Sequence, residues 1–182
     1  MAQISSAAEI ISLLKDIERR SAQQAAGLSQ QDDLQSAWTA IGFRVGEYHF
    51  LIPLSDSREV FPIPDQITAI PKAESWVHGI ANIRGELLPL FDLKYFLLGK
   101  KTQLKKRSRI MVINHPELYS GLLVDEVFGL KHFQREPEAI DANKNIKITA
   151  YLKGSVFQQD IHWDVFSFQK LADDKRFLNA AA

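Results

Sequence analysis

Much of the chain alternates apolar and polar positions with a period of two, which is typical of strands with one buried face. Ile41, Phe43 and Val45 occupy every second position, and the alternation resumes after Gly46-Glu47. A glycine at the first central position of a two-residue loop supplies the positive φ that a type II′ turn requires. This stretch therefore predicts a β-hairpin.

The same pattern returns further along the chain. A second hairpin is predicted where the runs 79–84 and 87–91 flank Gly85-Glu86. Short strands punctuated by Gly, Pro, Asn and Asp favour an all-β fold, either an antiparallel sandwich or small barrels that leave no exposed sheet edge. Further strands are expected at 58–63, 67–70, 109–114, 118–124, 127–133, 150–157 and 161–168.

Two short helices are expected to interrupt the strands. Asp92 can cap a helix over 93–98, and Gly99 can adopt the left-handed conformation that ends it. A last, C-terminal helix is expected over about 169–178.

The first 36 residues follow a different pattern. Apolar residues recur at spacings of three and four from Ile10 to Ile17, which places them on one face of a helix. A polar linker, 29–36, follows. We therefore interpret residues 1–36 as a helical N-terminal extension and residues 37–182 as the main domain. Because so short a stripe is not stable alone, it must pack on its own barrel, on a second copy of the chain or on a partner.

Composition removes several classes of protein. Among 182 residues, 22 Lys and Arg balance 22 Asp and Glu, so the chain lacks the overall positive field of a general nucleic-acid or membrane-surface binder. It has no cysteine, which excludes disulfides and Cys-ligated metals. No apolar run reaches the roughly 18 residues of a membrane helix, and no secretory signal is evident, so we expect a cytoplasmic protein.

The sequence shows no arrangement of residues that predicts catalysis. Its five histidines are scattered, and none pairs with another at the helical metal-site spacing. Asp125 and Glu126 are adjacent, so on a strand they would point to opposite faces and could not share a proton. Gly154-Ser155 is interpreted as a bulge or tight bend within a strand. We expect no enzyme activity, no metal and no cofactor.

Two polar stretches, 99–109 and 136–147, are interpreted as loops. Because the first lies near the middle of the β region, we expect two barrel-like halves joined there. It is also basic, so it could meet an acidic partner or nucleic acid, although a solvated loop is the simpler interpretation. A small β-barrel that binds nucleic acid through 100–109 is the alternative function, and the stretch carries no aromatic residue to stack on bases. Its cations are Lys100, Lys101, Lys105, Lys106, Arg107 and Arg109.

The most informative stretch is 76–93, which predicts a tight hairpin entered from a turn that carries a tryptophan. Ile80, Asn82 and Arg84 are expected on one side of its first strand. Arg84 stands next to the turn, where a guanidinium on a rigid hairpin is preorganised for a partner's carboxylate or carbonyl. Alternatively, Arg84 caps the turn or pairs with a nearby acid such as Glu86.

Residues 79–93 read Gly-Ile-Ala-Asn-Ile-Arg-Gly-Glu-x-x-Pro-x-x-Asp-Leu, which resembles the signature of the CheW-like adaptor family of bacterial chemosensory arrays. The resemblance extends over about 38–178 and includes Gly-Leu-Leu-Val-Asp-Glu-Val-Phe-Gly at 121–129. The N-terminal helix, the segment after Trp38 and the Phe-Leu-Asn ending more narrowly resemble the adaptors of the type IV pilus, or twitching motility, chemosensory system.

The resemblance implies two small SH3-like five-stranded antiparallel β-barrels, with the N-terminal helical extension and a short C-terminal helix added. It implies a scaffold without catalytic activity or cofactor. Such a scaffold joins the cytoplasmic tip of a methyl-accepting chemoreceptor to the regulatory domain of a CheA-type histidine kinase, in the cytoplasm at the membrane-associated receptor array. Neither nucleic-acid binding nor direct membrane insertion is expected.

The resemblance also assigns roles to residues. Arg84 matches the position associated with receptor binding in a groove between the barrels, and we expect Asn82 and Ile80 to contribute to that site. We expect the N-terminal stripe to pack on its own barrel or on the kinase, through Ile10, Leu14 and Ile17. The hairpin itself is expected to be shaped by Gly79, Gly85, Pro89 and Asp92.

Overall fold

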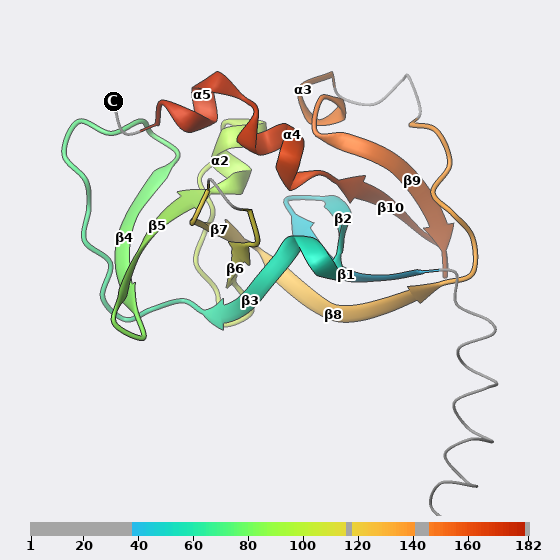
Figure 1. The fold of residues 1–182 in the computed structure, drawn as a ribbon, viewed down its shortest axis with the longest axis horizontal. Coiled ribbons are helices and arrows are strands. Elements are labelled where there is room, and N and C mark those ends of the chain that lie inside the picture. The colour runs from blue at the N-terminus through green and yellow to red at the C-terminus, as the bar shows by residue number, and fades with distance from the viewer. Residues whose placement is uncertain (1–37, 116–117, 141–145, 181–182) are drawn as a thin grey trace, which may run out of the picture. The chain divides into compact units, whose positions relative to one another are not determined.

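The structure, a computed structural model, describes residues 38–115, 118–140 and 146–180 (Figure 1). They belong to the compact unit Trp38–Ala182, and the predicted stripe of Ile10, Leu14 and Ile17 lies outside the described residues. No described helix is long and apolar enough to cross a membrane. In chain order the elements are β1 (Trp38–Val45), β2 (Tyr48–Pro53), η1 (Leu54–Asp56), β3 (Ser57–Pro62), β4 (Val77–Ile83), β5 (Glu86–Asp92), α2 (Leu93–Leu98), β6 (Arg109–Ile113), β7 (Gly121–Val124), β8 (Glu126–Phe133), α3 (Ile146–Thr149), β9 (Leu152–Gln158), β10 (Ile161–Phe166), α4 (Phe168–Ala172) and α5 (Lys175–Leu178).

The described strands form two five-stranded sheets, which confirms the predicted fold class. Sheet A has the order β8-β1-β2-β10-β9, and sheet B has the order β3-β6-β7-β5-β4. The expectation of purely antiparallel sheets is wrong in one detail, because β2 pairs with β10, and β5 with β7, in parallel. Each parallel pair joins two hairpins that are distant in sequence, so no tight turn dictates the direction in which they meet.

The chain runs twice through the same series of hairpin, single strand and hairpin: β1–β2, β3, β4–β5, and then β6–β7, β8, β9–β10. The two series do meet at 99–109, as predicted. However, the expectation that each series forms its own barrel is wrong, because β3 pairs with β6 in sheet B and β8 pairs with β1 in sheet A. Each sheet therefore contains strands from both halves of the chain (Figure 1).

The second hairpins of the two series correspond residue by residue. Ser167 caps α4 as Asp92 caps α2, and 167 − 92 = 75. The backbone hydrogen bonds follow the same offset. The N–H of Asp92 donates to the carbonyl oxygen of Trp76 at 2.7 Å, and the N–H of Ser167 donates to that of Tyr151 at 2.8 Å. This equivalence shows an internal two-fold repeat of the chain.

Two glycines of this repeat lie where another backbone approaches closely. A β-carbon on Gly79 would lie 2.5 Å from the carbonyl oxygen of Thr68, and one on Gly154 would lie 2.8 Å from that of Glu138. The approaching segments form the isolated bridges Thr68–Ile80 and Glu138–Ser155. The pairing of β9 with β10 shifts register beside Gly154, which confirms the expected bulge.

The predicted turns are right in one hairpin and displaced in the other. Gly46-Glu47 forms the β1–β2 turn, with φ of 63° at Gly46. The β4–β5 turn is Arg84-Gly85, one residue earlier than predicted, because Ile83 pairs with Glu86. Both turn residues have positive φ, 53° and 90°, as a type I′ turn requires.

The helix over 93–98 is confirmed, since the Asp92 carboxylate accepts from the N–H of Tyr95 and the helix ends at Gly99 with φ of 67°. The single helix expected over 169–178 is wrong. It is broken into α4 and α5, because Asp174 caps a new helix by accepting from the N–H of Arg176.

The remaining strand predictions hold with ends shifted by a few residues, with one exception. The segment 67–70 forms only the bridge at Thr68. The loop expected over 136–147 contributes a bridge at Glu138, and α3 begins at its end.

Each sheet surrounds a small core, and a larger core lies between the sheets. Trp163 and Leu51 are among the buried residues inside sheet A, and Leu88 and Ile110 among those inside sheet B. The central core combines residues of both sheets, including Phe43, Phe50, Phe91, Met111, Leu122 and Phe166. Each sheet with its own core is termed barrel A or barrel B below.

Candidate functional site

Arg84 lies at the tip of the β4–β5 hairpin and is largely solvent-exposed, with 73% of its side chain accessible. Its Nη1 donates to Oε1 of Glu59 at 2.6 Å, and its guanidinium lies 5.3 Å from the centre of the Phe61 ring. Glu59 and Phe61 belong to β3, which is the opposite edge strand of sheet B. The hairpin tip therefore reaches the far edge of its own sheet and closes barrel B.

A second set of contacts lies beside this closure. The Tyr119 hydroxyl donates to Oε2 of Glu86 at 2.8 Å, and the Arg58 guanidinium lies 5.6 Å from the centre of the Tyr119 ring. The hydrogen bond to the Glu86 carboxylate raises the pKa of Tyr119, because it favours the neutral hydroxyl that donates. The group is termed the barrel B mouth: Arg58, Glu59, Phe61, Arg84, Glu86 and Tyr119.

The backbone at Arg84 is held in a conformation that is unfavourable for a side chain with a β-carbon. Its φ is 53°, and such left-handed residues cost of order 1 kcal/mol or more. The Asn82 side chain stabilises the turn by accepting from the N–H of Gly85 at 2.8 Å. The hairpin thus presents the guanidinium from a fixed base, which lowers the entropy lost when a partner binds it.

The other two predicted receptor-contact residues lie on the same strand, β4, but their side chains have different environments. Asn82 is exposed, and its side-chain oxygen is engaged by the turn. Ile80 is half-buried, and its backbone exchanges two hydrogen bonds of 2.8 Å with Thr68. Across the ladder, Pro89 faces Ile80, and Leu87 faces Asn82 with 68% of its surface exposed.

The predicted hairpin-shaping residues act at both ends of the hairpin. Gly85 provides the second positive φ of the turn, and Gly79 admits Thr68 at the start of β4. Asp92 lies at the opposite end of β5 from the turn. Its buried carboxylate accepts from the N–H of Tyr95, and from the N–H and hydroxyl of Thr102, so it fixes α2 and the loop that follows.

Glu59, Phe61 and Tyr119 were not predicted as site residues. Glu59 and Phe61 are two positions apart on a predicted strand, so a shared face was foreseeable. Their contact with Arg84 depends on how the barrel closes, which no local signal in the sequence reports.

The adjacent acids Asp125 and Glu126 bind different groups of the chain, and Asp125 is buried rather than solvated. Asp125 accepts from the N–H of Gly46 at 2.6 Å and pairs with Lys94 at 3.3 Å. Glu126 pairs with Arg44 at 3.2 Å and with Arg107 at 3.1 Å. Within the described ranges, no cluster of three or more His, Asp or Glu side chains could hold a metal ion.

The internal repeat supplies a counterpart of the arginine site in barrel A. The residue at the offset of Arg84 is Gln159, and Gln159-Asp160 form the same kind of turn with φ of 53° and 58°. Gln159 is exposed and carries no charge. The fold therefore builds two similar hairpin tips, of which only the one in barrel B presents a guanidinium.

Comparison with known proteins is consistent with this architecture. The family model described as CheW-like domain matches residues 39–174. The chain is 38% identical over 170 residues to protein PilI of Pseudomonas aeruginosa, covering 93% of this chain and 94% of that one. It is 29% identical over 138 residues to the chemotaxis protein CheW of Helicobacter pylori, covering 73% and 82%. The crystal structure of the scaffolding protein TtCheW from Thermoanaerobacter tengcongensis has the same fold, with a TM-score of 0.65 at 24% identity over 76% of this chain and 94% of that one.

The two five-stranded sheets, each with its own core, and the hairpin that carries Arg84 define a small protein of two β-barrels. The chain belongs to the CheW-like family, and the resemblance seen in its sequence is confirmed.

Proposed function

We propose that the chain is a non-enzymatic coupling protein that links a methyl-accepting chemoreceptor to a CheA-type histidine kinase in a type IV pilus chemosensory pathway. The similarity to PilI along nearly the whole chain supports the pilus pathway. The exposed guanidinium on a fixed hairpin is the observation that supports a docking role. Such a protein works in the cytoplasm, at the array where receptors and kinases assemble.

The barrel B mouth is the proposed receptor site. A guanidinium has five N–H donors, and the pair with Glu59 engages one nitrogen of Arg84, which leaves donors for a receptor carboxylate or carbonyl. Exposed apolar surface of Leu87 and Val60 lies on the same sheet and suits the apolar stripe of a receptor helix. Asn82 and Ile80 complete the predicted contact set.

The kinase contact is proposed to use a different part of the molecule. The N-terminal stripe of Ile10, Leu14 and Ile17 is a candidate for it, packing either on its own barrel or on the kinase. A scaffold transmits a signal only if its partners bind differently in the active and inactive states of the kinase. We therefore expect the two partners to bind at once.

The two equivalent turns provide a matched test. Arg84→Ala and Gln159→Ala each shorten an exposed side chain at the first position of a type I′ turn. Loss of a central arginine contact costs about 2 kcal/mol, so Arg84→Ala should weaken binding of the receptor's cytoplasmic fragment roughly 30-fold, measured by calorimetry. Gln159→Ala should leave it unchanged.

Binding of the kinase regulatory domain serves as the second readout. Arg84→Ala should retain it, because the proposed kinase contact lies elsewhere. Unchanged receptor affinity in Arg84→Ala would remove Arg84 from the site. Absence of binding to both partners in the unmodified chain would refute the coupling function itself.

A further inference from the structure

The basic stretch between α2 and β6 is an ordered loop, held at both ends by hydrogen bonds. At its start, the buried Thr102 donates to the Asp92 carboxylate through its N–H at 2.8 Å and its hydroxyl at 2.7 Å. At its end, Ser108 and Lys105 exchange two bonds of 2.9 Å. These bonds hold the backbone over 102–108, and Lys100 and Lys101 lie between Thr102 and Gly99, the end of α2.

The two arginines of the loop are engaged within the chain. Nη1 of Arg107 pairs with Oε1 of Glu126 at 3.1 Å. Nη1 of Arg109 donates to the carbonyl oxygens of Lys106 and Ser108, both at 2.8 Å. Both guanidiniums are engaged in holding the loop, although Arg107 does so through one nitrogen and stays 79% exposed.

The lysines of the loop are in the opposite situation. All four are exposed, and among the described residues none of them forms a hydrogen bond or ion pair through its ammonium group. Leu104 stands between the two lysine pairs with half of its surface exposed. Lys100, Lys101, Lys105 and Lys106 with Leu104 are termed the lysine loop below.

We infer that the lysine loop is a docking surface for an acidic segment of a partner protein that carries an apolar side chain among its carboxylates. Four unpaired positive charges on a fixed backbone complement carboxylates at little ordering cost, and Leu104 offers the apolar contact between them. Nucleic acid fits less well, because the loop has no aromatic ring to stack on bases and exposes Leu104 among its cations.

This surface reaches from the far end of β5 to the edge of the proposed receptor site. β5 connects the two, with the Arg84-Gly85 turn before its first residue and Asp92, the anchor of the loop, as its last. A seven-residue strand spans roughly 20 Å. At its other end the loop borders the barrel B mouth, because Arg109 pairs with Pro62, the residue after Phe61 on β3. A segment on the lysine loop would therefore lie next to a partner bound at Arg84.

Fluorescence anisotropy with the full chain tests the inference. The probe is a fluorescein-labelled peptide of repeated Glu-Glu-Leu units, and its Gln-Gln-Leu analogue is the uncharged control. Binding of the acidic peptide should weaken at least about tenfold in the triple variant Lys101→Glu/Lys105→Glu/Lys106→Glu. It should weaken a few-fold in Leu104→Gln. The milder pair Lys105→Gln/Lys106→Gln removes two charges but keeps polar side chains of similar size. It should also reduce affinity, and it guards against misfolding of the triple variant.

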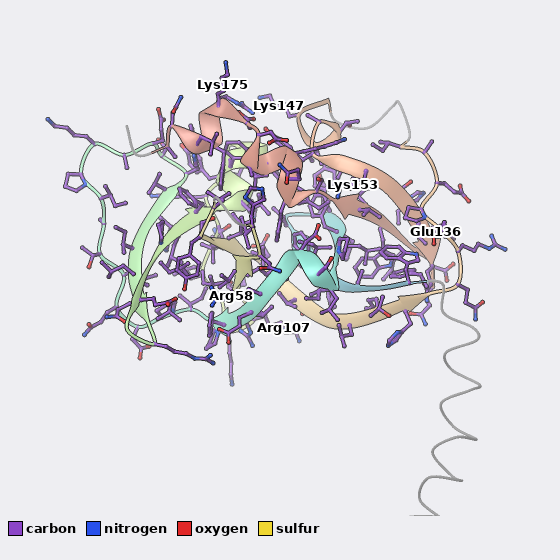
Figure 2. All side chains as sticks on the ribbon, in the orientation of Figure 1. Arg58, Arg107, Glu136, Lys147, Lys153 and Lys175 are labelled. Carbon is purple, nitrogen blue, oxygen red and sulfur yellow. The ribbon has the colours of Figure 1, made fainter. Side chains whose placement is uncertain are left out.

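A charge-matched variant separates the loop from the net charge. Lys72→Glu/Lys153→Glu/Lys175→Glu changes the same number of exposed lysines elsewhere in the chain. The side chains of Lys153 and Lys175 lie well away from that of Arg107 (Figure 2). This variant should retain most of the affinity.

Three results would overturn the inference. The first is equal affinity of the unmodified chain for the acidic and uncharged peptides. The second is an equal loss in the charge-matched variant, which would show that only net charge matters. The third is tighter, loop-dependent binding of an oligothymidine strand or of phosphatidylglycerol vesicles than of the peptide. None of these measurements involves the receptor or the kinase, so the proposed coupling function stands or falls separately.

Discussion

Asp92 offers the most quantitative test of how the fold is held together. Its side chain is 2% exposed and accepts three hydrogen bonds, from the Tyr95 N–H at 3.0 Å, the Thr102 N–H at 2.8 Å and the Thr102 hydroxyl at 2.7 Å. Each such bond stabilises the native state by about 1 kcal/mol, and more when the acceptor is charged. Asp92→Ala also leaves the N–H of Thr102 buried without a partner, which costs about 1–3 kcal/mol.

We therefore expect Asp92→Ala to lower the free energy of unfolding by about 4 kcal/mol. Two smaller changes calibrate this value. Thr102→Val removes only the hydroxyl bond and should cost about 1 kcal/mol. Ser167→Ala removes the equivalent cap of α4, a single bond to the Lys170 N–H at 3.2 Å, and should also cost about 1 kcal/mol.

Urea unfolding followed by tryptophan fluorescence measures all three variants, and the dependence of the unfolding free energy on urea should not change. If Asp92→Ala cost no more than Thr102→Val, the carboxylate would not be the anchor of α2 and the lysine loop. An effect of Ser167→Ala as large as that of Asp92→Ala would show that helix capping alone explains the loss.

The remaining predictions concern backbone approach and pH. Gly154→Ala should lower the free energy of unfolding by about 2 kcal/mol or more, because the new β-carbon would meet the Glu138 carbonyl. Gly129→Ala is the control: the space there is open but φ is 81°, so it should cost about 1 kcal/mol. Equal losses in urea unfolding would contradict this reasoning. The hydrogen bond from Arg176 lowers the pKa of Asp174 from 3.8 to about 2. Because the folded pKa is the lower one, the stabilisation by Asp174 is present above pH 4 and is lost as the pH falls through about 2. Asp174→Asn should flatten this part of the stability profile measured by acid titration, and an unchanged profile would refute the assignment.

Features encoded by consecutive residues were predictable from the sequence. The cap at Asp92, the helix after it and its end at Gly99 follow from signals within one short stretch, and the Gly46-Glu47 turn follows from a glycine between two alternating runs. The β4–β5 turn was displaced by one residue because the Asn82 side chain fixes Gly85 at the second turn position. That preference depends on a side-chain hydrogen bond, which hydrophobic alternation does not report.

Features that depend on distant residues were not predictable. The pair between Arg84 and Glu59 joins opposite edge strands of one sheet, and Asp174, which caps α5, also accepts a hydrogen bond from the hydroxyl of the distant Tyr151. The internal repeat is hidden for a related reason. Equivalent positions share backbone requirements, such as the close approach of another backbone at Gly79 and Gly154. Few of their side chains are identical.

The reciprocal placement of β3 and β8 affects how the molecule can come apart. If the chain were cut in the connection between α2 and β6, neither fragment would contain all five strands of sheet A or all five strands of sheet B. Separate fragments would therefore expose unpaired strand edges, and they should regain order only when mixed. In the intact protein, neither half of the chain can unfold without breaking strand pairs in both sheets.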